Sequence, residues 1–306
     1  MPEVYVPLTV LAVLLLIYFA LGFVIAKRTL FRKGKNNQQA IESERASGIS
    51  EDEIFYSPSK TLQTRSKDNL LLSADLFLCK EKSDKWVITI HGYLSQNMTM
   101  AKYAKMFNDF GYNVLATELR NSGKSQGNYY SFGYKEKEDC LNWISFLQEN
   151  FQVKHLGLFG ISMGAATVIM TAERNEQVDF AISYCSYSSF RAIITHQVGK
   201  QMGGFFKICY PAVSLASLIL TGLKSWEIKP EKSIAGVKCP TLIMHSKKDE
   251  FTPYTQSVAI HQGNKNTYLH LFEEGRHARA YSANREEYIK TVQKFLEKAE
   301  ENFSEN

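Results

Sequence analysis

The sequence predicts an α/β protein with a mostly parallel central sheet and helices on both of its faces. Strand-like and helix-like segments alternate over most of the 306 residues, which is typical of parallel sheets with helical crossovers. A hydrophobic content of 44% and a charged content of 22% are ordinary for a globular chain. Without an N-terminal segment, about 250 residues are left, and one domain of this class can use them all.

The expected elements follow in chain order. Residues 54–79 contain an antiparallel opening, with Asp68-Asn69 as its turn. The later strands are expected at residues 86–90, 112–117, 155–159, 179–185, 241–245 and 267–272. The helices between and after them are expected near residues 98–110, 135–150, 163–174, 254–262 and 283–300.

Between residues 187 and 231 the alternation stops. This insertion is apolar and helix-forming, with Gly203-Gly204 and Pro211 as breaks. We expect a helical lid that excludes water and supplies an apolar wall for a substrate. The alternative is ordinary packing helices.

One local motif carries chemistry. The segment Gly160-Ile161-Ser162-Met163-Gly164 lies between an apolar run and a small, helix-forming stretch. A serine on such a strand-to-helix turn points its hydroxyl out of the sheet, and small neighbours let the turn close. Ser162 is therefore the expected nucleophile.

A nucleophilic serine needs a histidine as base, and that histidine needs a carboxylate to orient it. The partners should follow the serine in the order acid, then base. His277 lies in the loop after the last strand, from where it can reach the edge of the sheet, and it is the expected base. His245 and His261 are the competing histidines, and a loop histidine without a catalytic role is the alternative for His277.

Asp249 is the expected acid because it lies just beyond the carboxyl end of the strand at 241–245. Glu250 is the adjacent competitor. His245 lies at the end of that strand and is expected to be structural.

Acyl transfer also needs backbone N–H groups aimed at the developing oxyanion. The residue after the nucleophile, Met163, should supply one of them. Tyr93, after the strand at 86–90, should supply the other, because Gly92 lets the backbone approach closely. We expect His91 to brace this loop.

These motifs together resemble those of the α/β-hydrolase fold serine hydrolases. More narrowly, the chain is similar to uncharacterised membrane-anchored hydrolases of Gram-positive bacteria, in the serine aminopeptidase and esterase-like branch. The resemblance covers residues 54–298 and rests on five segments: His91-Gly92-Tyr93, residues 119–125, 160–164 and 245–253, and Gly275-Arg276-His277. Many relatives have Asp-x-Arg-Gly-His-Gly where this chain has residues 118–123, a segment that shapes a loop. The resemblance implies an acyl-enzyme mechanism with no cofactor and no metal, and it leaves the substrate open.

The N-terminus carries a separate signal. Residues 4–26 hold no charged side chain, and as a helix they would span about 34 Å, enough to cross a hydrocarbon core of roughly 30 Å. We expect residues 1–26 to form a transmembrane anchor. A cleaved secretory signal, with Ala20 and Gly22 near the cleavage site, and a buried core helix are the alternatives.

Basic residues follow this segment directly, at Lys27, Arg28, Arg32, Lys33 and Lys35. Positive flanks tend to stay in the cytoplasm, so we expect a single-pass protein of the cell membrane with a cytoplasmic hydrolase domain. The five cysteines, odd in number and without C-x-x-C or zinc spacing, favour a reducing compartment. Residues 27–53 are polar and are expected as a partly helical stalk or a flexible linker before a domain covering residues 54–306.

Other partners leave little trace in the sequence. The net charge of +5 is mild and part of it comes from the basic cluster, so no nucleic-acid partner is indicated. Gly123-Lys124-Ser125 is not a phosphate loop, because Glu118 occupies the position of its first glycine. The oligomeric state stays open.

Function follows from the site and the lid. An apolar lid suits an acyl group, so we expect hydrolysis of a carboxylic ester or thioester, with a small-molecule acyl substrate. A peptidase or amidase is the first alternative, although the acids of the insertion, Glu227 and Glu231, both lie at its end. The second alternative is a catalytically silent binding module tethered to the membrane.

Overall fold

The computed structural model describes residues 2–301. Met1 and residues 302–306, which the expected anchor and domain included, lie outside the described residues. The centre is an eight-stranded sheet in the order β1-β2-β4-β3-β5-β6-β7-β8. Its strands are β1 (Lys60–Arg65), β2 (Leu71–Phe77), β3 (Lys85–Ile90), β4 (Asn113–Thr117), β5 (His155–Ile161), β6 (Phe180–Tyr184), β7 (Thr241–Ser246) and β8 (Thr267–Phe272).

The sheet is mostly parallel, as predicted. Only the first two strands pair in antiparallel fashion, β1 with β2 and β2 with β4, whereas β3 to β8 all run parallel. Each expected strand is present, with ends that differ by one or two residues. Because the strands are parallel, their carboxyl ends meet at one edge of the sheet, and this edge carries the candidate site.

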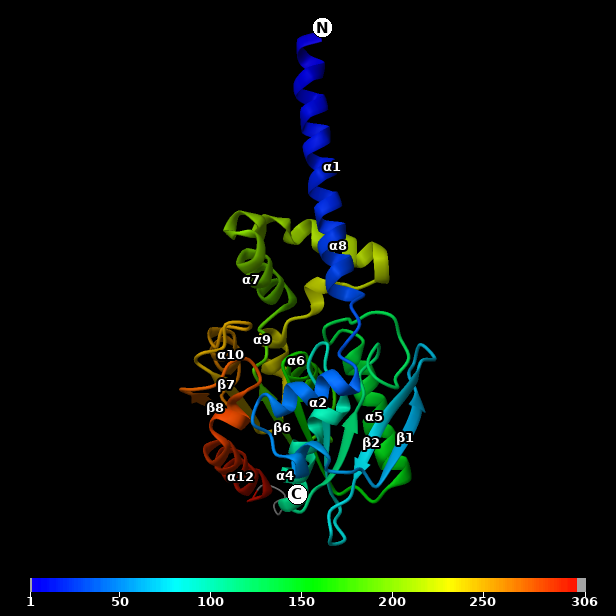
Figure 1. Ribbon diagram of the computed structural model, residues 1–306, viewed down its shortest axis with the longest axis vertical. Coiled ribbons are helices and arrows are strands. Elements are labelled where there is room, and N and C mark those ends of the chain that lie inside the picture. Colours follow the sequence, from blue (N-terminus) through cyan, green and yellow to red (C-terminus); the bar gives the residue numbers. More distant parts are fainter. Residues whose placement is uncertain (1, 302–306) are drawn as a thin grey trace.

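Helices cover both faces of the sheet (Figure 1). Successive strand residues point to opposite faces, so Ile88 and Leu158 belong to one apolar core while Val87 and Phe159 belong to the other. The main helices of the domain are α4 (Ala101–Asp109), α5 (Glu136–Asn150), α6 (Met163–Ala172), α10 (Thr255–His261) and α12 (Arg285–Glu301); α9 (Pro230–Ser233) and α11 (Ala280–Ala283) are single turns.

The insertion after β6 forms two cap helices, α7 (Phe190–Met202) and α8 (Tyr210–Thr221). The second half of helix α1 (Pro2–Leu30) crosses α8, while its first half projects away from the domain (Figure 1). The crossing is close: a Cβ atom on Gly22 would lie 2.5 Å from that of Ala212. Helix α1 has the length and composition of a membrane span over Pro7–Leu30.

Residues 27–53 are partly helical and pack against the domain through a few buried side chains. They form the end of α1, then α2 (Asn37–Arg45) and α3 (Glu51–Ile54), and Asn36 caps α2 through a capping box. Buried Glu44 pairs with Lys102, and buried Glu53 accepts a hydrogen bond from the Tyr281 hydroxyl at 2.6 Å. The sequence pattern could not show this packing, because each buried carboxylate finds a partner far along the chain.

Candidate active site

Ser162 lies on a strained turn between β5 and α6. Its φ of 57° and ψ of −112° place it in a region that residues other than glycine rarely adopt. The flanking glycines permit the turn, because a Cβ atom on Gly160 would lie 2.3 Å from the Gly164 carbonyl oxygen. A Cβ atom on Gly164 would lie 2.1 Å from the Ile90 carbonyl oxygen. Glycine is therefore required at positions 160 and 164 because a side chain at either would collide with the backbone.

The structure brings Ser162, His277 and Asp249 into one chain of hydrogen bonds. His277, in the loop between β8 and α11, has its Nε2 2.9 Å from the Ser162 Oγ and its Nδ1 2.6 Å from the Asp249 Oδ2. A carboxylate only accepts, so Nδ1 donates to it and Nε2 is left to accept the serine proton. Ser162 and Asp249 are buried, whereas His277 is half-buried. The other candidates lie elsewhere: His261 contacts Thr267, and exposed Glu250 pairs with Lys200.

Four hydrogen-bond donors surround the Asp249 carboxylate. Its Oδ1 accepts the backbone N–H groups of Phe251 and Thr252 at 2.9 and 2.8 Å. Its Oδ2 accepts from His277 and also from the Nε2 of His245 at 3.0 Å. Burial alone would raise the pKa of Asp249, but the hydrogen bonds from His245 and His277 outweigh it and hold the pKa well below its usual range. Asp249 is therefore ionised at neutral pH.

His245, expected to be structural, contacts the acid directly. Its Nε2 also lies 2.7 Å from the Thr252 carbonyl oxygen, and its Nδ1 lies 2.7 Å from the Ser257 hydroxyl. The Asp249 Oδ2 and the Thr252 carbonyl oxygen can only accept, so the Nε2 of His245 carries the ring proton. His245 precedes Asp249 by four residues at the end of a strand. This spacing is the sequence signal that could have predicted their contact.

The two residues expected to supply the oxyanion hole adjoin Ser162. Met163 follows it and opens α6, while the loop after β3 passes so close that a Cβ atom on Gly92 would lie 3.4 Å from that of Ser162. Tyr93 lines the same cavity as Ser162. His91 braces this loop, because its Nε2 accepts the Leu119 N–H at 3.1 Å and its Nδ1 contacts the Gly92 carbonyl at 2.8 Å.

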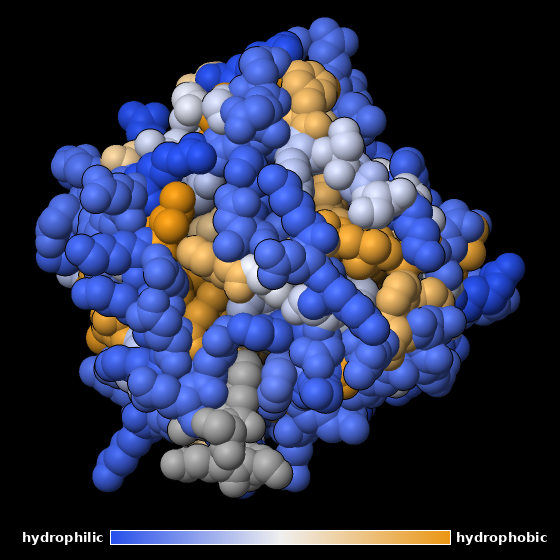
Figure 2. Space-filling model, turned by 90° about the horizontal axis from the view of Figure 1, so that it is seen from below, coloured by the Kyte–Doolittle hydropathy of each residue, from blue (hydrophilic) through white to orange (hydrophobic). Residues whose placement is uncertain are grey.

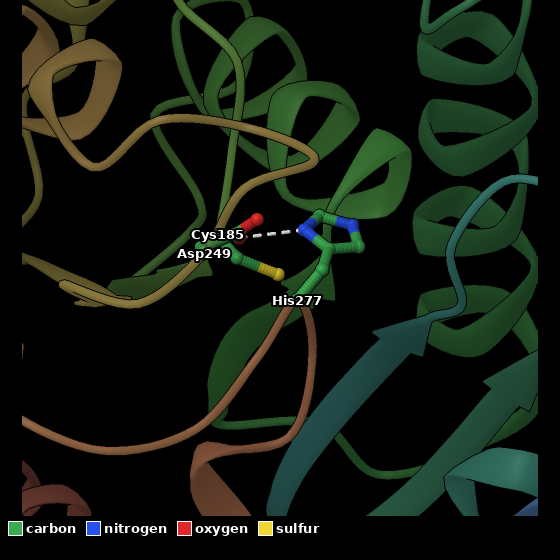
Figure 3. A group of neighbouring side chains, drawn as sticks. All are labelled: Cys185, Asp249 and His277. Carbon is green, nitrogen blue, oxygen red and sulfur yellow. Dashed lines mark hydrogen bonds and ion pairs between the residues drawn. The ribbon is translucent and has the colours of Figure 1, made fainter.

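A buried thiol lies beside the acid and the base. The ligand atoms of Cys185, Asp249 and His277 are all within 4.8 Å of one another (Figure 3). Metals bind the thiolate, but burial raises the pKa of the Cys185 thiol well above its ordinary value. Asp249 and His277 already share a hydrogen bond. This donor set fits a hydrogen-bonded triad with a neighbouring thiol better than a metal centre.

Two cavities flank Ser162. One, of about 310 Å³, lies between α1 and α7 and is lined mainly by apolar side chains. The other, of about 350 Å³, lies towards α2 and is lined by polar and charged side chains as well as His277. The contribution of α1 to a wall of the site was not foreseen from the sequence.

The chain is similar to proteins that share this architecture. It is 28% identical over 288 residues to an uncharacterised protein of Bacillus subtilis, YqkD, across 91% of this chain and 92% of that one. Among solved structures, an esterase of Pyrococcus furiosus aligns over 78% of this chain and 90% of its own, with 23% identity and a TM-score of 0.66. An acylaminoacyl peptidase of Pyrococcus horikoshii aligns over 78% and 41%, with 20% identity and a TM-score of 0.60. These likenesses identify the α/β-hydrolase fold.

A family model shows to which family of this fold the chain belongs. The model of the prolyl oligopeptidase family matches residues 98–302, a segment that runs from the start of α4 past the end of α12 and includes the serine turn. Because that segment is more than half of the chain, this protein belongs to the prolyl oligopeptidase family and is a serine hydrolase.

Proposed function

We propose that this serine hydrolase cleaves a carboxylic ester or thioester through an acyl-enzyme on Ser162, with His277 as base and Asp249 as acid. One observation carries the proposal: the unbroken hydrogen-bond chain from the Ser162 hydroxyl through His277 to an ionised, buried Asp249. This arrangement activates a serine for attack on a carbonyl group.

The mechanism follows from these contacts. The Ser162 Oγ attacks the carbonyl carbon while its proton passes to the Nε2 of His277, and Asp249 stabilises the imidazolium that forms. The N–H groups of Tyr93 and Met163 bind the oxyanion. His277 then gives its proton to the leaving oxygen or sulfur, and water releases the acyl group by the same steps in reverse order.

The charges around the site favour an ester over an unblocked peptide. A substrate with a free amine needs a carboxylate to bind it. Among the described residues, Glu44 is the only acidic one that lines either cavity, and it is already paired with Lys102 and lies 3.8 Å from Arg279. A peptidase or amidase activity is the second candidate, supported by the family model and by the acylaminoacyl peptidase neighbour.

We further propose that α1 anchors the protein in the cell membrane as a single span, with the hydrolase domain on the cytoplasmic side. The exposed apolar first half of α1 supports the anchor. The basic residues at its end support the cytoplasmic side. In this arrangement α7 and α8 act as a lid at the membrane surface.

A fluorophosphonate probe tests the nucleophile. The full chain, purified in detergent, is expected to be labelled, whereas Ser162→Ala is not. His277→Ala should be labelled far more slowly, while the matched histidine variant His261→Ala should be labelled like the wild type. Labelling that persists in Ser162→Ala would contradict the assignment. A folded wild type that stays unlabelled would favour a silent binding module.

A matched substrate pair then separates the two candidate activities. A p-nitrophenyl ester and a p-nitroanilide with the same acyl group differ only in the bond that is cleaved. We expect faster turnover of the ester than the inherent difference in reactivity explains, judged against uncatalysed hydrolysis of each. A catalysed rate enhancement that is larger for the anilide would favour the peptidase.

A further inference from the structure

Ser162 lies where two compartments meet that differ in their charged side chains. Of the two cavities, only the first is walled by apolar side chains from both α1 and α7; these are Leu21, Val24 and Ile25 of α1 and Ile193, Ile194 and Val198 of α7. Its volume of about 310 Å³ is within the range of small-molecule sites, roughly 300–1,000 Å³. It fits an acyl chain.

The second compartment carries an excess of positive charge. Four cationic side chains line it, those of Arg32, Lys35, Lys102 and Arg279, together with one carboxylate, that of Glu44. Glu44 lies within ion-pair distance of both Lys102 and Arg279. The Lys35 ammonium donates to the Ser43 hydroxyl at 2.8 Å. Within the described residues, no carboxylate forms an ion pair with Lys35 or Arg32. These two charges are available to a ligand.

Arg32 also lines the apolar compartment, where Arg28 is its cationic neighbour. Arg32 and Ser162 thus both line the two compartments. A guanidinium presents a fork of donors that matches a phosphate. An ester with an apolar acyl group and a phosphorylated alcohol fits both compartments at once.

The apolar wall continues into the segment that can cross a membrane. Between Leu8 and Phe19, α1 exposes most of its apolar side chains, and Leu16 is 70% exposed. Around the place where α1 leaves the domain, Ile208, Leu215 and Ile219 are also exposed. Such a patch favours contact with lipid. A chain held in the bilayer could pass along α1 into the compartment without entering water.

We propose that the substrate is a membrane lipid, an acyl ester whose alcohol carries a phosphate. The acyl chain lies between α1 and α7, and the phosphate binds Arg32 and Lys35. The inference rests on the proposed function. The ester C–O bond breaks, the acyl group passes to the Ser162 oxygen, and the phosphorylated alcohol leaves with the proton from His277. Water then releases the fatty acid.

The test compares two lipids that differ only in the phosphate. The full chain is placed in nanodiscs of ether-linked phosphatidylcholine, which it cannot hydrolyse, with 1-oleoylglycerol 3-phosphate or 1-oleoylglycerol. We expect kcat/KM to be at least tenfold higher for the phosphorylated lipid. Arg32→Gln should lower this ratio roughly tenfold, as the loss of a hydrogen bond to a charged group does. Lys27→Gln, which removes an equal charge that lines neither cavity, should leave the ratio unchanged.

A second arm tests the acyl compartment. Val24→Trp, which narrows the compartment, should shift the preference from an 18-carbon to an 8-carbon chain, whereas Leu16→Trp on the projecting half of α1 should not. An unchanged chain preference in Val24→Trp would overturn the assignment of this compartment.

Further outcomes distinguish a failure of the lipid inference from a failure of the proposed function. Turnover that depends on Ser162 but is equal for the two lipids, with a ratio unaltered by Arg32→Gln, would overturn the lipid inference and leave the proposed function standing. Faster turnover of oleoyl-coenzyme A from solution would assign the phosphate to a soluble thioester instead of a lipid. The absence of Ser162-dependent turnover of every ester would overturn the proposed function itself.

Discussion

The sheet and the region around α1 differ in how completely they bury their apolar side chains. Every residue of β4, β6 and β7 is buried, whereas α1 and α8 expose large side chains such as Leu16 and Ile219. The end of the molecule opposite the projecting α1 is mostly hydrophilic, with only scattered apolar patches (Figure 2). Exposed large apolar side chains are therefore concentrated along α1 and in the cap region.

This difference separates side chains that the protein itself buries from side chains that it leaves exposed. The sheet lies between two apolar cores, and α1 and α8 contribute to one of them through Ile25 and Val213. The same two helices also present a surface that an apolar environment would stabilise. Ser162, Asp249 and His277 follow strands β5, β7 and β8 of the sheet. The walls of the first cavity beside the serine come partly from α1 and α7. The triad is thus positioned by the sheet, whereas one cavity beside Ser162 depends on how α1 packs against α7.

The largest expected effect is a loss of activity in a variant of the triad, which the sheet positions. Asp249→Asn should lower kcat by about 10⁴-fold, because an amide no longer holds His277 in the tautomer that accepts the serine proton. Initial rates with an ester substrate measure the loss. The neighbouring variant Glu250→Gln removes an exposed carboxylate with no contact to His277 and should retain nearly full activity. Equal losses in the two variants would mean that the wrong acid has been assigned.

A pair of glycine variants compares the two regions directly. Gly164→Ala forces a Cβ atom onto the Ile90 carbonyl, and overpacking of this kind costs about 1–3 kcal/mol or more, which corresponds to a Tm lower by roughly 5–10 °C. Gly22→Ala is as crowded, against Ala212, but α1 can shift across α8.

We therefore expect the Tm of Gly22→Ala to stay within about 3 °C of the wild type. Differential scanning calorimetry in one detergent compares both variants. A larger loss in Gly22→Ala than in Gly164→Ala would show that α1 is an integral part of the folding core and would remove the distinction between the regions.

The third effect is a dependence of stability on pH. The folded pKa of Asp249 is depressed, so its ionised form stabilises the fold above the pKa of the unfolded state, about 4, and the contribution is lost as pH falls through the folded value. The free energy of unfolding of the wild type should therefore exceed that of Asp249→Asn at pH 7, and the gap should narrow below about pH 4. Denaturant titrations at several pH values measure it. A gap that grows as the pH falls would contradict the assigned hydrogen bonds.

The smallest effect concerns the contact of the cap with lipid. In vesicles containing brominated lipid, Ile219→Trp should gain fluorescence that bromine quenches. Leu78→Trp replaces a side chain of similar exposure outside the α1 and cap-helix region and should gain fluorescence that is not quenched. Quenching that is equal for the two positions would place the cap away from the bilayer.

Much of the frame could be predicted from local patterns. The strands followed from short apolar runs, the serine turn from two glycines whose spacing has a steric cause, and α1 from an uncharged stretch of sufficient length. Ser162, Asp249 and His277 could be named because each follows a strand whose carboxyl end reaches the same edge of the sheet. The structure shows their contact, and their catalytic roles remain the proposal that the variants above test.

The sequence by itself thus determined the order and type of the elements, because backbone propensity and the burial period are local properties. Only the tertiary structure decided which distant groups meet. It packed residues 27–53 against the domain through buried Glu44 and Glu53, and it set α1 against α7 as a wall of the cavity at Ser162. Each of these contacts joins groups whose pairing depends on the packing of the whole chain, and no local pattern encodes such a pairing.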